Sequence, residues 1–410
     1  MKDDDQVNKS LIDETYSKLR TTGFELKAVV KTIHVTSPPT PGKLFGMSLA
    51  VKDMVAIKGE VRGNGNPHDM QLGAAELQDS PLIASLRGAG VAIVATTSML
   101  EYAAGAQHPE LAEARSPLNP QLTAGGSSGG SAALIGAGVC DLAIGTDTGG
   151  SIRIPAAYCG AIGLKPSTGR LATVGITALS PTLDHAGFLA QRIESIEAAM
   201  SVATSDWRDV TTPQSLRLGV PEGWVEDPRV DHRIVQQFRE LLAELESHGI
   251  KINTIDITLF EEFRKIFLPI LLFEMWEIYG TRATNEPERF GPDTLRLFNA
   301  SHGVTQAEYQ SARTKRDQLL QHLAGAMAGV DALIMPTTPY FPPEKTPPID
   351  SELGAYEGLF VEVFNATGQP AISLPMRGAP MPFGIQLVGY RNQDEELLKI
   401  SHFLTQWIHR

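Results

Sequence analysis

Three short segments of the chain contain residues whose types and spacing could perform covalent chemistry. The first runs from Gly145 to Arg153 (GTDTGGSIR), and Ser151 stands at the end of the glycine turn in this segment. A strand that enters such a turn can direct several backbone N–H groups at one point, which is how enzymes stabilise the oxyanion of a tetrahedral intermediate. Ser151 would then be the nucleophile. A phosphate-binding loop or an ordinary tight turn is the alternative, because glycine patterns of this kind are widespread.

The second segment, GGSSGGS at 125–131, opens a helix that we expect to reach Cys140. Its core satisfies G-x-S-x-G, which would make Ser128 the nucleophile of an α/β-hydrolase. That motif needs a strand directly before it, whereas residues 115–120 (RSPLNP) are rich in turn formers. It also needs an acid and then a histidine downstream, and Asp184 and His185 are adjacent. The hydrolase interpretation is therefore disfavoured.

The third segment is a short apolar run, 47–51, that ends in Lys52. A lysine at the end of a strand usually projects into water. Its amine can act as a general base only if burial or nearby positive charge lowers its pKa toward neutrality. Lys52 by itself therefore does not indicate a catalytic base. It becomes a candidate base only when it is considered together with the two serine segments.

Taken together, the three segments resemble the amidase signature family. The resemblance rests on AVKD (50–53), GGSSGGSAAL (125–134) and GTDTGGSIRIPAAYCGAIGLKPS (145–167). It extends to residues 178–187 and 369–389, and thus covers most of 43–400, being weakest between about 205 and 360.

The resemblance implies a Ser-cisSer-Lys triad. Ser151 would attack the amide carbonyl, and Ser127 would pass the Ser151 proton to neutral Lys52, which would act as the base. The peptide bond that precedes Ser127 would be cis. The resemblance also implies supporting groups, namely the oxyanion-hole N–H groups of Thr148, Gly149, Gly150 and Ser151, and the positions of Ser128, Asp147 and Arg153, which hold the loops in place. We expect no metal and no cofactor. Asp184 is expected to fix a turn, and His185 and His108 to have structural or surface roles.

The elements that must position these residues alternate between strands and helices, which favours one large α/β domain with a central mixed sheet surrounded by helices. We expect a signature core at about 43–200, a variable and mostly helical region at about 205–360, and C-terminal strands and a helix at about 361–410. The predicted strands are 47–51, 91–97, 142–146, 216–220, 250–255, 332–335, 371–375 and 383–388. The predicted helices are 1–20, 81–90, 231–248 and 394–407, a mainly helical region covers 256–330, and loops cover 37–42 and 340–348.

Composition narrows the choice of partner. The net charge is −12, apolar residues make up 42% and charged residues 20% of the 410 residues. This acidity, without a cluster of Lys and Arg, argues against nucleic acid and anionic membranes. No apolar stretch is long enough for a membrane span, and the acidic N-terminus does not resemble a secretory signal, so we expect a cytoplasmic protein.

The two cysteines, Cys140 and Cys159, predict neither disulfides nor zinc, and Cys159 is expected to be an inert packed thiol.

We therefore expect an amidohydrolase that cleaves the C–N bond of a small carboxamide, releasing ammonia or an amine and a carboxylate. Two alternatives stay open: the glutaminase subunit of a tRNA-dependent amidotransferase, and a catalytically silent binding protein with the same fold. The expected binding partner is a small-molecule amide substrate. Assembly of the chain into a homodimer is left open as a further alternative. Thr182 stands where the family often has serine, and Met99–His108 is expected to contribute to the pocket wall.

Overall fold

The computed structural model describes residues 11–35, 40–213, 215–257, 260–376, 378–379 and 381–408. Within these ranges, eleven strands form one mixed sheet, in the order β1-β3-β2-β6-β8-β7-β12-β13-β11-β9-β10. The pairs β3-β2, β2-β6, β11-β9 and β9-β10 are parallel, whereas the pairs from β6 to β11 in the middle and the edge pair β1-β3 are antiparallel. The chain is thus a single α/β domain built around a large central sheet, as predicted.

The sheet strands are short, and most of those near the centre are buried along their whole length. Their bounds are β1 (Val29–Thr32), β2 (Ser48–Lys52), β3 (Ala92–Thr97), β6 (Leu142–Asp147), β7 (Ile162–Lys165), β8 (His185–Ala190), β9 (Arg217–Pro221), β10 (Lys251–Ile255), β11 (Ala332–Pro336), β12 (Ala371–Pro375) and β13 (Gly384–Val388). The eight predicted strands are all present, within a few residues at their ends. β1, β7 and β8 were not predicted.

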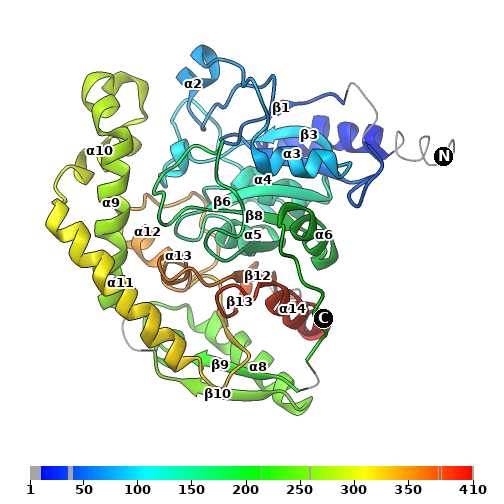
Figure 1. The fold of residues 1–410 in the computed structure, drawn as a ribbon, viewed down its shortest axis with the longest axis vertical. Coiled ribbons are helices and arrows are strands. Elements are labelled where there is room, and N and C mark those ends of the chain that lie inside the picture. Colours follow the sequence, from blue (N-terminus) through cyan, green and yellow to red (C-terminus); the bar gives the residue numbers. More distant parts are fainter. Residues whose placement is uncertain are drawn as a thin grey trace.

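Helices cover the sheet and extend beyond it. Their bounds are α2 (Pro67–Leu72), α3 (Pro81–Gly88), α4 (Gly129–Gly136), α5 (Arg153–Cys159), α6 (Ile193–Ala203), α7 (Glu222–Val225), α8 (His232–Ser247), α9 (Phe260–Asn285), α10 (Pro292–Ser301), α11 (Gln306–Ala326), α12 (Glu352–Glu357), α13 (Glu362–Ala366) and α14 (Asp394–Ile408), with short helical turns η1 (Leu19–Gly23), η2 (Glu101–Ala103) and η3 (Pro287–Arg289). The predicted mainly helical region is confirmed as α9, α10 and α11. In Figure 1 these three helices form a layer along one side of the molecule, and α9 contacts α13.

Two sequence predictions need correction. The helix after the GGSSGGS segment ends at Gly136 and does not reach Cys140, because the chain turns at Gly138, where φ is +64°. The approach to that segment is also not a simple turn. Residues 115–123 form a small hairpin, β4 (Arg115–Ser116) with β5 (Asn119–Thr123), which is separate from the central sheet.

The leading helix is present over residues 11–18 and continues into η1, and residues 1–10 of that prediction lie outside the described residues. The same holds for 37–39 of the predicted loop at 37–42.

Candidate active site

Lys52 is the last residue of β2, which lies between β3 and β6 in the sheet. Its side chain has no exposed surface. The Lys52 Nζ lies 2.7 Å from the Ser127 Oγ and 2.7 Å from the Thr146 Oγ1 on the neighbouring strand β6. The predicted base and relay are therefore brought together, and Thr146, which sequence reasoning did not single out, supplies the second contact.

Burial changes the acid–base behaviour of Lys52. The loss of water around the charged amine lowers its pKa from 10.5 to about 7, while the carboxylates of Asp147 and Asp184 oppose this shift. A large fraction of the amine is therefore neutral near pH 7, which is the state that a general base requires.

Ser127 follows a cis peptide bond at Gly126–Ser127, as predicted. A Cβ at position 126 would lie 2.1 Å from the Leu100 Cδ1, so a larger residue there would require the Leu100 side chain to move. Helix α4 begins two residues later, and the Ser128 N–H donates to the Ser151 carbonyl at 3.1 Å. This bond ties the two serine segments to each other.

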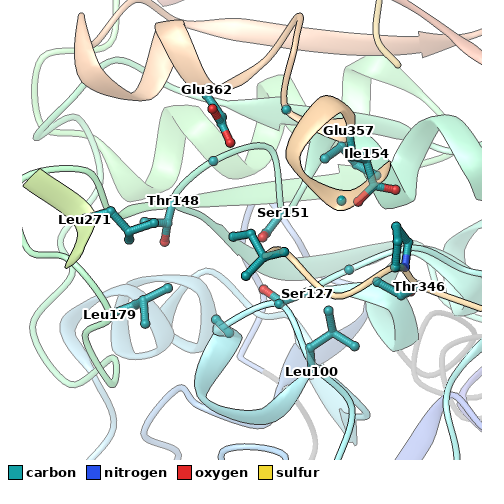
Figure 2. A pocket seen from close by; sticks show the side chains of 18 of the residues that line it. Leu100, Ser127, Thr148, Ser151, Ile154, Leu179, Leu271, Thr346, Glu357 and Glu362 are labelled. Atoms are coloured by element: carbon teal, nitrogen blue, oxygen red, sulfur yellow. The ribbon is translucent and has the colours of Figure 1, made fainter. Parts of the chain in front are cut away.

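Ser151 follows the turn at the end of β6. The turn needs glycine at position 150, where φ is +115° and a Cβ would lie 2.5 Å from the Val361 Cγ2. Ser151 and Ser127 both line a pocket of about 70 Å³, and in Figure 2 their hydroxyls lie in the same part of it. Ser151 is partly exposed and can be reached from the pocket, whereas Ser127 and Lys52 are buried.

The predicted oxyanion hole divides into two parts. Thr148, Gly149 and Ser151 line the pocket. Gly150 does not, and its N–H already donates to the Asp147 Oδ1 at 2.7 Å. In this structure the Gly150 N–H therefore holds the loop, and the other three N–H groups stay the predicted donors.

Asp147 and Arg153 form a fully buried ion pair. The Arg153 Nη2 and Nε lie 2.9 Å from Oδ1 and 3.0 Å from Oδ2 of Asp147. Burial alone would raise the pKa of Asp147, but the charge and hydrogen bonds of Arg153 hold it below its usual value. Arg153 also donates to the Val361 carbonyl and the Gln386 side chain, which links the glycine turn to the C-terminal part of the chain. This agrees with the loop-holding role expected for both residues.

Ser128 also holds a loop. Its Oγ donates to the Thr146 carbonyl at 3.1 Å and accepts from the Thr146 N–H at 3.2 Å. Its hydroxyl is therefore engaged with β6, in keeping with the loop-holding role that the family resemblance implied.

Asp184 fixes a turn, as predicted, by accepting from the N–H groups of Leu179 and Ser180. It also accepts from the Thr148 hydroxyl at 2.6 Å, which the sequence did not indicate. Burial raises its pKa to about 6. His185 is buried between the Leu183 carbonyl and the Thr168 hydroxyl, and burial lowers its pKa.

The remaining singled-out residues have structural contacts. His108 is buried and accepts from the Glu110 N–H. Burial raises the pKa of the Cys159 thiol, as expected for an inert packed cysteine. Thr182 is bound to the Glu274 carboxylate of α9 through its N–H at 3.0 Å and its hydroxyl at 2.6 Å.

The pocket wall combines the predicted segment with parts of the variable region. Leu100, Ala103 and Gly105 lie in it, as predicted for Met99–His108. The variable and C-terminal regions add two carboxyl side chains that sequence reasoning missed, Glu357 and Glu362. Glu362 could have been noticed as a single acid inside the apolar run Leu359–Phe364 (LFVEVF).

Neither a metal-binding cluster nor a membrane-spanning helix occurs in the described part of the chain. No group of three or more His, Cys, Asp or Glu side chains there could hold a metal ion. No helix in the same ranges is both long and apolar enough to cross a lipid bilayer.

Comparison with known proteins gives concordant matches. The family model described as Amidase matches residues 25–398. A protein of Symbiobacterium thermophilum that forms part of a glutamyl-tRNA(Gln) amidotransferase is 30% identical over 404 residues, covering 88% of this chain and 82% of that protein. A crystal structure of an amidase superposes with a TM-score of 0.87 and 27% identity, covering 97% of this chain and 95% of that one. A bacterial aryl acylamidase has the same fold, with a TM-score of 0.83 at 18% identity, covering 98% and 93% of the two chains.

Proposed function

Since this chain belongs to the amidase signature family, we propose that it hydrolyses the C–N bond of a small carboxamide through an acyl-enzyme on Ser151. The observation that supports this most is the 2.7 Å contact between the Lys52 Nζ and the Ser127 Oγ, formed by a buried lysine whose pKa is about 7, next to a pocket that contains Ser151.

The reaction would proceed in two halves. In the first, neutral Lys52 accepts a proton from Ser127, Ser127 accepts one from Ser151, and the Ser151 Oγ attacks the amide carbonyl. The negative oxygen of the tetrahedral intermediate would be bound by the N–H groups of Thr148, Gly149 and Ser151. The proton returns along the same path to the leaving nitrogen, the C–N bond breaks, and ammonia or an amine departs. In the second half, water attacks the acyl-enzyme by the same relay and releases the carboxylate.

The test combines a reagent that labels a reactive serine covalently with an assay that measures the release of ammonia or an amine. A fluorophosphonate probe should label the wild-type protein at Ser151, and Ser151→Ala should not be labelled. The wild type should release ammonia or an amine from members of a panel of simple amides, with Ser151→Ala as the blank. Absence of labelling in a folded wild-type sample would favour the silent binding protein instead.

A second candidate is the glutaminase subunit of a tRNA-dependent amidotransferase, which the identity with the Symbiobacterium thermophilum protein favours. The described residues that line the pocket argue against it, because they include Glu357 and Glu362 but no Lys, Arg or His to bind the α-carboxylate of glutamine. Ammonia release from glutamine that requires a co-purifying second protein would reverse this choice.

A further inference from the structure

The pocket that contains Ser151 has an uneven distribution of charge. Its walls are mostly apolar, with Leu100, Ile154 and Leu271 among them. The charged side chains among its described lining residues are both carboxyls, Glu357 and Glu362, and Figure 2 shows both projecting into it from the segment that contains α12 and α13. A ligand in this pocket would therefore meet negative charge and no positive charge from the lining residues.

The two carboxyls differ in how well the protein compensates them. Glu357 accepts a hydrogen bond from the Tyr158 hydroxyl at 2.9 Å. The Glu362 Oε2 is buried and has no hydrogen-bond partner within the described residues. It forms an ion pair with the Arg264 Nε at 3.5 Å, and this Nε itself lacks a hydrogen-bond acceptor among those residues.

Such an arrangement is costly for the protein alone. Glu362 is only 3% exposed, and burial raises the pKa of its carboxyl to about 7 although Arg264 opposes the shift. The Glu362 Oε2 has lost its hydration and has the Arg264 charge nearby, but it has no hydrogen bond within the described residues, and a positively charged donor would supply one. The incomplete partner set of Glu362 therefore points to a ligand group that completes it.

The position of Glu362 relates it to the reacting atoms. A Cβ built on Gly149 would lie 3.5 Å from the Glu362 Cγ, so the stem of this side chain packs beside the turn that leads to Ser151. Glu362 and Ser151 line the same pocket, so one small molecule can contact both.

We propose that Glu362 is a specificity-determining residue that binds a protonated amine in the acyl part of the substrate, so that the preferred substrates are carboxamides with an ammonium group. This inference rests on the proposed amidase function and names its substrate class. The competing explanation is that Arg264 neutralises Glu362 and that the pair only fastens α9 to α13.

The main experiment compares three primary amides of equal chain length: 4-aminobutanamide, butanamide and succinamate, which carry a positive, a neutral and a negative end. Ammonia release is measured at pH 8 with the wild type, Glu362→Gln and Glu357→Gln. A charge-assisted hydrogen bond predicts a kcat/KM for 4-aminobutanamide that is about tenfold or more above that for butanamide in the wild type. Succinamate should be the slowest of the three.

Glu362→Gln should reduce the ratio of 4-aminobutanamide to butanamide to about twofold or less and should raise the rate with succinamate relative to butanamide. Glu357→Gln is the matched control, because its carboxyl is already bound by Tyr158, and it should keep most of the preference. An unchanged ratio in Glu362→Gln would overturn the inference. So would an equal loss of preference in both variants, because the total charge of the pocket would then account for it.

A second measurement needs no variant. Butylammonium should protect Ser151 of the wild type from a neutral fluorophosphonate at concentrations at which butyrate does not, and equal protection by both would overturn the inference. The two failures can be told apart. If Ser151 is labelled and amides are hydrolysed without a preference for the ammonium substrate, only the substrate class is wrong. If neither labelling nor hydrolysis occurs, the proposed function itself fails.

Discussion

Replacing Lys52 with methionine tests whether this lysine is held in the folded protein at a cost in stability. Methionine has a similar length and no charge, so it removes the need to bury an amine. The ordinary lysine pKa of 10.5 applies to the unfolded chain, and the folded value is about 7. The unfolded state therefore binds more protons than the folded state between pH 7 and pH 10.5, and the wild type gains stability as the pH rises through this window.

The size of the effect follows from the two pKa values. Forcing the amine toward neutrality costs the folded wild type about 4 kcal/mol at pH 7 and about 2 kcal/mol at pH 9, at about 1.4 kcal/mol per pKa unit. Lys52→Met also leaves the hydroxyls of Ser127 and Thr146 without the amine. That second loss does not depend on pH in this range. The free energy of unfolding of the variant relative to the wild type should therefore fall by about 2 kcal/mol between pH 7 and pH 9.

The measurement is equilibrium urea unfolding of both proteins at the two pH values, followed by tryptophan fluorescence. Lys165 is also buried with a pKa of about 7, but it is present in both proteins and cancels in the difference. Ser151→Ala, which keeps Lys52, is the control and should behave like the wild type at both pH values. A difference between Lys52→Met and wild type that stays constant from pH 7 to pH 9 would refute the conclusion that the Lys52 amine is desolvated and displaced in pKa.

Two further predictions concern the same region. The kcat/KM of the wild type should rise with pH around pH 7 and level off above it, because neutral Lys52 is the active form. At pH 6 it should be about tenfold below this high-pH plateau, and a flat profile from pH 6 to pH 8 would contradict the prediction. Asp147→Asn leaves Arg153 with an unpaired buried charge and should cost about 3 kcal/mol or more in unfolding free energy, measured by urea titration. It also removes a negative charge that raises the pKa of Lys52, so any residual activity should reach its plateau at a lower pH, whereas an unchanged midpoint would argue that Asp147 does not act on Lys52.

The sequence predicted best those elements that combine strong local patterning with a glycine signal. β2, β6 and β12 are apolar runs that end at a polar residue or at proline, and their positions were expected within a residue or two. β7 was missed because it has only four residues, and β8 (HAGFLA) because its first half is a histidine and two small residues, so neither is a strong apolar run. Both become strands by pairing with each other and with distant partners.

The site divides in a similar way. Lys52, Ser127 and Ser151 could be named because the motifs around them are local in sequence. Their hydrogen-bond partners could not, because those depend on long-range packing. Asn365 is an example: it accepts from Arg153 and donates to the Asp147 carbonyl and carboxylate although more than two hundred residues separate it from both. Long-range packing likewise determines that the Gly150 N–H donates to Asp147 and that the Glu362 Oε2 lacks a hydrogen bond within the described residues, so neither could be predicted from the sequence.

Asp147 connects the two demands that the proposed chemistry makes on this site. The relay needs a lysine buried deeply enough to lose its proton near neutral pH, yet burial alone would lower the pKa of Lys52 further than the carboxylates of Asp147 and Asp184 allow. The oxyanion donors need a rigid turn, and the same Asp147 carboxylate fixes that turn through the N–H groups of Gly150 and Ile152. Arg153 keeps Asp147 ionised, so the ion pair sets both the shape of the turn and the charge that balances the lysine. Because one carboxylate serves both purposes, a mutation there should affect the pH profile and the stability together.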